Sequence, residues 1–249
     1  MALVSIHYWF ASDEVRSLLS SNGLCDLDSA LRLGDSLDDR LHEVRASRHD
    51  FKRVVSQAIS SPAGSTTVYI KRQWRRVRWI PRVTDVRHRI GLKCSPIHEW
   101  RGLRILHTAG FDVAEPLALF WNGWGFSQGA IVTRAVPPQS SIADLLVRGE
   151  LQAMADERRR SLIQAAVAVV ARLHRERISW RSMKAKHFYP EEVTPSRWRI
   201  WLIDCEGVCQ KASRHDCQRE WRTYLQFVSK LAPTLEDHFR LAYTSATNA

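Results

Sequence analysis

The chain has 249 residues, of which 45% are hydrophobic and 25% charged. This is ordinary globular usage, and it excludes a collagen-like, low-complexity or wholly disordered chain. Lys and Arg number 37 against 26 Asp and Glu, so the formal net charge is +11. Such an excess indicates a polyanionic partner: nucleic acid, an anionic membrane surface or a phosphorylated glycolipid. The five cysteines are too few for a disulfide framework, and their odd number favours free thiols.

Positive charge is densest between Lys71 and Lys93, where nine Lys and Arg stand against one acid, Asp85. We expect this stretch to meet the anionic partner; the alternative is a solvated basic face without a specific ligand. No apolar run reaches the roughly 18 residues of a membrane span. The N-terminal segment MALVSIHYWFASDEV lacks the basic start of a secretory signal. A cytoplasmic protein is therefore predicted.

The first part of the chain carries two helix signals followed by a hairpin signal. Short helices are predicted over Asp13–Ser20 and Leu27–Leu33. A strand is predicted over Phe51–Ile59, and the β-branched and aromatic run Thr66–Lys71 predicts a second one. A turn rich in Ser, Pro and Gly separates the two strands, so we expect them to pair as a hairpin.

A helix and a second hairpin follow. Ser95-Pro96 is typical of a helix start, with Ser as the cap and Pro at the first helical position, and Gly110 ends the helix. The runs Ala114–Trp121 and Ala130–Val136 flank the turn dipeptide Asn122-Gly123. This pattern predicts a second β-hairpin.

The character of the chain changes to helix after Pro137-Pro138, which we interpret as a hinge. Apolar residues at helical spacing predict a buried helix over Leu162–Arg175. Two short strands are predicted over His187–Tyr189 and Arg199–Ile203, and helix from Asp216 onward. The order predicts an α+β fold with two lobes and a cleft between them.

Three charged residues have positions that suit phosphoryl transfer. Lys71 ends the strand VYIK, Glu99 lies in the first turns of the next helix, and Asp204 ends the apolar strand IWLID. Such a site needs a Lys on the α/β-phosphates, a Glu that orients the Lys and an Asp that holds Mg²⁺. Each residue also has an ordinary explanation, as a surface lysine, a helix-dipole partner and a turn residue.

The sequence offers little support for other common catalytic or metal-binding motifs. The chain has no G-x-x-x-x-G-K-[ST], G-x-S-x-G or H-E-x-x-H motif. Three cysteines and a histidine gather in the C-terminal part, but their spacing fits no common structural zinc pattern; they are Cys205, Cys209, His215 and Cys217.

Several segments, in this order, resemble the lipopolysaccharide kinase family, which are bacterial sugar kinases with a protein-kinase-like fold. The resemblance rests on VYIKRQWRR (68–76), HEWRGLRILHTAGFDVAEPLALF (98–120), KAKHF (184–188), LIDCEGV (202–208), HFRLAY (238–243) and LSSNGLCDLDSAL (19–31). It therefore covers most of the chain.

The resemblance implies one α+β, bilobal kinase-like domain, with an antiparallel-sheet N-lobe over residues 51–136 and a helical C-lobe over 137–249. Residues 1–50 would be an N-terminal helical extension. It implies ATP and Mg²⁺ as cofactors and a heptose or Kdo hydroxyl of the lipopolysaccharide inner core as acceptor. It also implies a peripheral location at the cytoplasmic face of the inner membrane of a Gram-negative bacterium.

Carried onto this sequence, the functional positions of the family fall on seven residues. They are Lys71, Glu99 and Arg134 for the nucleotide, Asp204 and His187 for the metal, and Ser182 and Lys184 in the catalytic loop.

Two departures from the family pattern bear on activity. The catalytic loop reads Trp180-Arg181-Ser182 where kinases have H-R-D, and a neutral hydroxyl does not accept a proton as a carboxylate does. The segment Glu43–Ser56, where a nucleotide-covering loop is expected, contains no glycine. Two hypotheses remain open: an ATP-dependent sugar kinase of reduced activity, and a pseudokinase that serves as a binding subunit. A nucleic-acid-binding protein is the third, but no such motif is present and no nucleic-acid partner is expected.

Overall fold

The structure is a computed structural model that describes residues 6–32, 41–46, 52–61, 64–73, 95–122 and 128–248. The chain divides into two compact units. Unit 1 consists of Met1–Trp100 and Glu115–Ala135, and unit 2 of Arg101–Ala114 and Val136–Ala249. The predicted hinge at Pro137-Pro138 therefore falls just after the last change of unit.

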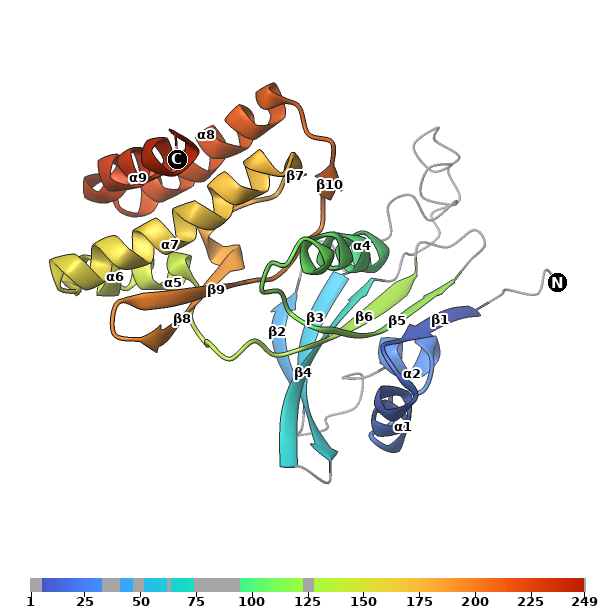
Figure 1. Ribbon diagram of the computed structural model, residues 1–249. Coiled ribbons are helices and arrows are strands. Elements are labelled where there is room, and N and C mark those ends of the chain that lie inside the picture. The colour runs from blue at the N-terminus through green and yellow to red at the C-terminus, as the bar shows by residue number, and fades with distance from the viewer. Residues whose placement is uncertain are drawn as a thin grey trace. The chain divides into compact units, whose positions relative to one another are not determined.

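Unit 1 is built on a six-stranded antiparallel sheet (Figure 1). Its strand order is β1 (Ile6–Phe10), β5 (Pro116–Asn122), β6 (Gly129–Arg134), β4 (Gly64–Gln73), β3 (Lys52–Ser61) and β2 (Leu41–Ala46). The two hairpins predicted from the turn residues are both present, because β3 pairs with β4 and β5 with β6. Strands β1 and β2 were not predicted. The region expected to be a helical extension thus also contributes both edges of the sheet.

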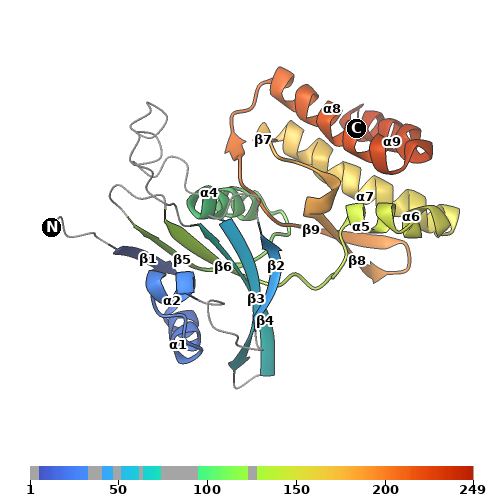
Figure 2. The ribbon, with the colours of Figure 1, turned by 180° about the vertical axis from the view of Figure 1, so that it is seen from behind.

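Helices cover both faces of this sheet (Figure 2). Helices α1 (Asp13–Ser21) and α2 (Leu27–Arg32) pack on one face, where buried side chains of the helices meet those of the strands. The part of helix α4 (Ser95–Thr108) that belongs to unit 1, up to Trp100, lies on the other face, where Trp100 makes an edge-on ring contact with Trp9 of β1. The core between the sheet and the first two helices consists of Leu19, Leu24, Leu27, Ala30, Val55, Ile59, Val68, Ile70, Leu117, Ala118, Phe120, Ala130 and Val132.

The basic stretch Lys71–Lys93 lies largely outside the described residues, since only its first three positions are described. Two of these positions carry charge. We expected both side chains on the surface, but neither lies there. Arg72 is 1% exposed, and its guanidinium donates to the Leu31 carbonyl at 2.7 Å. Lys71 points to the opposite face of the sheet, toward α4. The alternation of β4 explains both placements, because each of its faces is covered by a helix.

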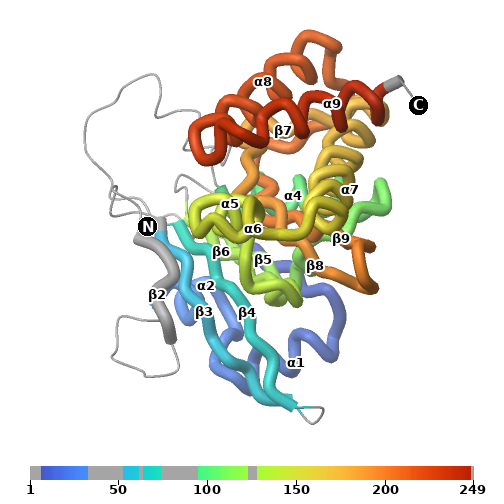
Figure 3. The backbone as a smooth tube through the Cα atoms, turned by 90° about the vertical axis from the view of Figure 1, so that its left-hand side faces the viewer, coloured from blue at the N-terminus to red at the C-terminus, as the bar shows by residue number. Residues whose placement is uncertain are grey.

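Unit 2 is mainly helical, with α5 (Ile142–Val147), α6 (Glu150–Ala153), α7 (Asp156–Arg175), α8 (Arg214–Leu231) and α9 (Glu236–Asn248). Helices α7, α8 and α9 pack on one another (Figure 3). Two antiparallel ladders complete the unit: β7 (Ile178–Trp180) with β10 (Val208–Gln210), and β8 (Phe188–Thr194) with β9 (Arg197–Leu202). None of the helices in the described part of the chain is both long and apolar enough to cross a membrane.

Local sequence explains helices α7 and α8. The apolar stripe that predicted a buried helix lies in α7, where Leu162, Ala166 and Val170 are fully buried. Helix α8 begins with a capping box, in which the Ser213 hydroxyl accepts from the Asp216 N–H while the Asp216 carboxylate accepts from the Ser213 N–H. The start of α8 before Asp216 agrees with the predicted C-terminal helical region.

Candidate active site

Strand β4 and helix α4 bring Lys71 and Glu99 together in unit 1. The Lys71 ammonium lies 2.7 Å from Glu99 Oε2, and the two side chains are only 16% and 9% exposed. The ion pair predicted from a strand-end lysine and a helix glutamate 28 residues later is therefore present. A second bond fixes the start of the helix, because the Ser95 N–H donates to Gln73 Oε1 at 2.9 Å.

The Lys71–Glu99 ion pair fixes the position of the lysine ammonium. Lys71 and Gln73 lie on one face of β4, so the sheet and the first turn of α4 hold each other in register. Breaking a partly buried ion pair leaves an uncompensated charge, which costs several kcal/mol. The glutamate thus fixes the ammonium at one place, as the phosphates of a nucleotide would require.

Arg134 does not join this pair. Its guanidinium Nε lies 2.7 Å from Glu115 Oε2, and both side chains are partly exposed. In the β4–β6 register, Arg134 faces Val68, whereas Lys71 faces Ile131. The structure therefore places Arg134 three residues along β6 from the lysine's partner, in a separate ion pair.

Unit 2 brings His187 and Asp204 together. Asp204 follows β9 with a left-handed φ of 54°, which is uncommon for a residue other than glycine. His187 Nε2 lies 3.5 Å from Asp204 Oδ2, and the Ile203 N–H donates to the His187 carbonyl at 3.2 Å. The imidazole is 4% exposed and stacks on the Trp180 ring, while the Asp204 carboxylate is 36% exposed. A buried histidine thus lies beside an accessible carboxylate.

The catalytic-loop segment forms a turn in which Ser182 has a structural partner. The Ser182 hydroxyl donates to the Glu206 carbonyl at 2.6 Å, and the Met183 N–H donates to the Trp180 carbonyl. Lys184 comes next and precedes the short 3-10 helix Ala185–His187. Ser182 and Lys184 therefore lie on the turn that leads directly to His187.

Asp216 and Glu206 are two acids that could replace the carboxylate missing at position 182, but the side chain of Asp216 is already bonded elsewhere. It caps α8 with Ser213, and its carboxylate pairs with Arg219 at 2.9 Å. The Ser213 hydrogen bonds hold the pKa of Asp216 below its usual value. Glu206 lies on the turn beside Ser182, and its backbone carbonyl receives the hydroxyl.

Two residues that support this region, Glu220 and Gly102, were not predicted from the sequence. Glu220 of α8 is 3% exposed and accepts from the Trp180 N–H at 2.9 Å, and burial raises its pKa. The sequence signal for Glu220 is a charged residue that shares the buried face of its helix with Cys217 and Tyr224. Gly102 of α4 packs against Cys205, and an added Cβ there would lie 2.0 Å from the Cys205 carbonyl oxygen. An isolated glycine inside a helix is the signal for such a close approach.

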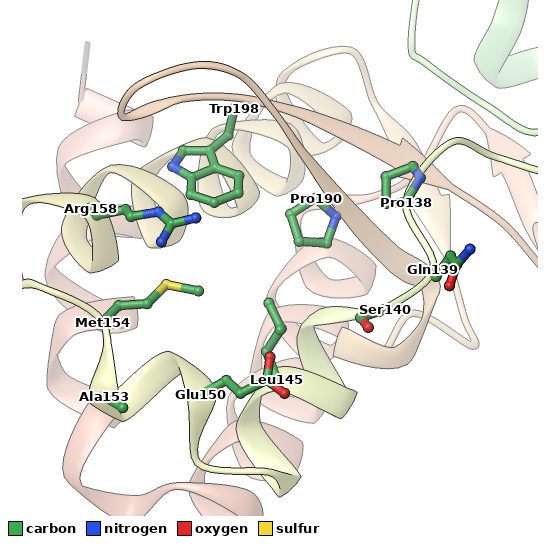
Figure 4. A pocket seen from close by; sticks show the side chains of 10 residues that line it. All are labelled: Pro138, Gln139, Ser140, Leu145, Glu150, Ala153, Met154, Arg158, Pro190 and Trp198. Carbon is green, nitrogen blue, oxygen red and sulfur yellow. The ribbon is translucent and has the colours of Figure 1, made fainter.

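In the part of the chain that the structure describes, neither a metal cluster nor an open pocket in unit 2 adds to this site. Within the described residues, no three His, Cys, Asp or Glu side chains gather in a way that would hold a metal ion. An open pocket of about 550 Å³ in unit 2 is lined by residues from α5, α6, α7 and the β8–β9 hairpin, including Leu145, Met154 and Trp198 (Figure 4). None of the seven predicted site residues lines it.

A sheet lysine paired with a helix glutamate, followed by a helical unit that carries an Asp at a strand end, defines a protein of the kinase-like class. A family model described as "Lipopolysaccharide kinase (Kdo/WaaP) family" matches residues 39–232. This is well over half of the chain, so the protein belongs to the lipopolysaccharide kinase family, as its sequence motifs predicted.

A solved structure described as "WaaP in complex with acyl carrier protein" is similar to this chain, with a TM-score of 0.53 and 15% identity. The match covers 97% of this chain and 98% of that one. At this identity the likeness shows the fold, and the bilobal kinase-like fold predicted from the sequence is confirmed. No protein among the curated proteins matches this chain.

Proposed function

We propose that this protein binds ATP and transfers its γ-phosphoryl group to a sugar hydroxyl, of heptose or Kdo, in the lipopolysaccharide inner core. The observation that carries the proposal is the Lys71–Glu99 ion pair of 2.7 Å, held by β4 on one side and α4 on the other. A lipopolysaccharide kinase family implies ATP as phosphoryl donor. Lys71 would contact the α/β-phosphates, and Glu99 would orient it. Arg134 is assigned a supporting role toward the nucleotide.

Mg²⁺ fits the residues present. Mg²⁺ prefers oxygen ligands and usually binds through one or two carboxylates together with substrate phosphates and water. Asp204 offers such a carboxylate on an accessible side chain, and His187 holds it from the buried side. An imidazole is a poor ligand for Mg²⁺, so we assign His187 to orienting Asp204. Bound there, the ion would neutralise charge on the transferred phosphoryl group.

The residue at position 182 limits the rate. Ser182 lacks the carboxylate that would accept the acceptor's proton, and a general base typically contributes about 10²- to 10⁴-fold. Phosphoryl transfer draws most of its catalysis from positioning and electrostatics, which Lys71, Lys184 and Asp204 would still supply. We therefore propose a slow kinase with intact ATP binding.

ATP-induced thermal stabilisation tests the nucleotide site. A ligand at 100 times its Kd stabilises a protein by about 2.7 kcal/mol, which shifts the melting temperature measurably. We expect this shift in the native protein with ATP and Mg²⁺, and its loss in Lys71→Ala. Lys230→Ala, on the exposed side of α8, is the matched control and should keep the shift. An unchanged shift in Lys71→Ala would contradict the assignment.

Mass spectrometry of the lipopolysaccharide core tests the reaction. Cells without the gene should lack one core phosphate, and the native gene should restore it. Ser182→Asp should raise the rate of transfer to a core-sugar acceptor in vitro.

A catalytically inactive binding subunit is the second candidate function. The observation that favours it is the Ser182 hydroxyl bonded to the Glu206 carbonyl, a structural contact in place of a base. No ATP binding by the native protein, together with no gain of transfer in Ser182→Asp, would establish this function instead.

The place of action that suits an inner-core acceptor is the cytoplasmic face of the inner membrane of a Gram-negative bacterium. We propose that the basic segment 74–93, outside the described residues, contacts anionic headgroups there, since each Lys or Arg near such a surface contributes about 1 kcal/mol. The similar WaaP structure holds an acyl carrier protein, so a carrier protein is a partner to test by co-purification.

A further inference from the structure

Strand β1 is fixed to the sheet of unit 1 along its whole length. It pairs with β5 over five residues, and the Ala11 N–H extends the ladder by donating to the Leu117 carbonyl at 2.9 Å. On the face that α1 and α2 cover, the Phe10 ring packs edge-on against the buried Phe120 ring, with centroids 5.4 Å apart. Side chains alternate along a strand, so Trp9 points to the opposite face. Strand β1 therefore holds Trp9 in a fixed place on the face of α4.

Trp9 and Lys71 belong to one row of residues across this face. Trp9 is opposite Leu119 of β5, Leu119 is opposite Ile131 of β6, and Ile131 is opposite Lys71 of β4. Leu119 and Ile131, which lie between the two ends of the row, are buried. Three inter-strand spacings separate Trp9 from Lys71, or about 14 Å. Any effect of Trp9 on the lysine must therefore pass through another element.

Helix α4 contacts both ends of this row through two consecutive residues. Glu99 Oε2 lies 2.7 Å from the Lys71 ammonium. The Trp100 ring meets the Trp9 ring at a centroid distance of 5.5 Å, with the ring planes at 67°. Consecutive residues of a helix point about 100° apart around its axis. The two contacts, both within unit 1, therefore hold the helix from two sides.

The rotation of α4 about its own axis decides whether Glu99 reaches Lys71. A rotation of about 30° would move a side-chain end that lies roughly 5–6 Å from the axis by about 3 Å. A shift of that size breaks a bond that needs a separation of about 3 Å. The Ser95–Gln73 bond acts on the helix backbone, only about 2 Å from the axis, so it resists rotation less than a side-chain contact does. The contact between Trp9 and Trp100 acts further out and resists rotation more.

We propose that Trp9 is a positioning residue of the nucleotide site, which sets the rotation of α4 through Trp100 and so keeps the Glu99 carboxylate on the Lys71 ammonium. This inference rests on the proposed function for the role of the ion pair in nucleotide binding. Strand β1 lies outside residues 39–232, which the family model matches, so membership of the family does not supply this contact.

Acetylation of lysines by acetic anhydride, read by mass spectrometry on the full chain, tests the proposal without a nucleotide. A lysine held by a carboxylate reacts slowly, and Glu99→Gln gives the rate of Lys71 without its carboxylate. Trp9→Ala should raise the Lys71 rate about three- to tenfold, the effect of one aromatic ring pair, and Trp9→Phe should restore a rate close to the native one. Lys230, exposed on α8, should react at its native rate in every variant.

Tyr8→Ala is the matched control. Tyr8 is the neighbour of Trp9 on the same strand, but it points to the other face, where its ring contacts Phe10 and the Arg16 guanidinium. This variant should leave the Lys71 rate unchanged. An equal rise in Tyr8→Ala and Trp9→Ala would show that a loosened β1 is the cause and would overturn the proposal, as would a native Lys71 rate in Trp9→Ala. Trp9→Leu, which keeps apolar volume without a ring, provides the same test if the alanine variant does not fold.

ATP binding, measured by calorimetry with Mg²⁺, separates this inference from the proposed function. Trp9→Ala should weaken ATP binding about three- to tenfold, whereas Trp9→Phe and Tyr8→Ala should bind as the native protein does. A raised Lys71 rate in Trp9→Ala supports the inference even if the native protein binds no ATP, and only the proposed function then fails. Equal ATP affinity in the native protein and Trp9→Ala would overturn the inference and leave the proposed function intact.

Discussion

Gly102→Ala is the sharpest test of how Asp204 is positioned. The new Cβ would lie 2.0 Å from the Cys205 carbonyl oxygen and 3.0 Å from its carbonyl carbon. Non-bonded heavy atoms settle near 3.5 Å, so Cys205 must retreat by about 1 Å or more. Cys205 follows Asp204 directly and is fully buried, so the displacement passes into the Asp204 backbone.

The two effects of this substitution on stability oppose each other. Alanine gains up to about 1 kcal/mol over glycine in a helix, whereas overpacking costs about 1–3 kcal/mol. We therefore expect a small loss of stability. A misplacement of about 1 Å in a catalytic group costs about 10²-fold in rate, so the effect on function should be much larger.

The assay is the ATP-induced shift in melting temperature with Mg²⁺ and with EDTA. In Gly102→Ala, the share of the melting-temperature shift that depends on Mg²⁺ should disappear. The share that remains in EDTA, which we assign to ATP bound at Lys71, should be unchanged. The control is Gly149→Ala, whose Cβ would meet nothing within 4 Å, so that its cost comes from the backbone alone, because a φ of 72° disfavours alanine. A native Mg²⁺-dependent shift in Gly102→Ala would refute the argument.

Three further predictions concern unit 2. Asp204→Asn should remove Mg²⁺-dependent ATP binding without lowering the melting temperature of the free protein; an unchanged Mg²⁺ response would show that the metal role is wrong. Glu220→Ala should cost about 1–3 kcal/mol in urea unfolding because it leaves the buried Trp180 N–H without its acceptor, and Glu220→Gln should cost less because an amide oxygen still accepts. Burial lowers the pKa of His174 from 6.5 to about 4. As the pH falls, this histidine is therefore protonated in the unfolded chain before it is protonated in the folded protein. The free energy of unfolding should fall by about 3 kcal/mol between pH 6.5 and pH 4. In His174→Gln this part of the pH dependence should disappear, and a profile identical to the native one would exclude His174 as its source.

Short-range signals were sufficient to predict the ion pair between Lys71 and Glu99. A β-branched strand ending in Lys71 and a Ser-Pro helix start four residues before Glu99 are both local patterns. Their meeting depends only on the helix packing across the strand, which the Gln73–Ser95 bond enforces. The pair was therefore predicted to the residue.

Elements that depend on distant partners were missed. Strand β7 has three residues and exists because β10, about thirty residues later, pairs with it. Its backbone is further held by Glu220, from a helix that no local window around Trp180 contains. Strands β1 and β2 are the edges of the sheet, where only one neighbour stabilises a strand. Sequence periodicity does not contain this information.

The Ser182 hydroxyl stabilises the turn that contains it, but it is not the carboxylate that a kinase uses as a base at this position. As a donor to the Glu206 carbonyl at 2.6 Å, Ser182 ties the turn to the segment that follows Asp204. A carboxylate at that position has no proton to donate, so in Ser182→Asp two acceptors would face each other and the turn must open. Ser182→Asp should therefore lower the melting temperature while raising phosphoryl transfer, whereas Ser182→Ala should lower the melting temperature without raising transfer. A rise in transfer without loss of stability would show that the Glu206 bond does not hold the turn. The bond therefore explains how the turn Trp180–Met183 stays closed with a serine, and not a carboxylate, at position 182.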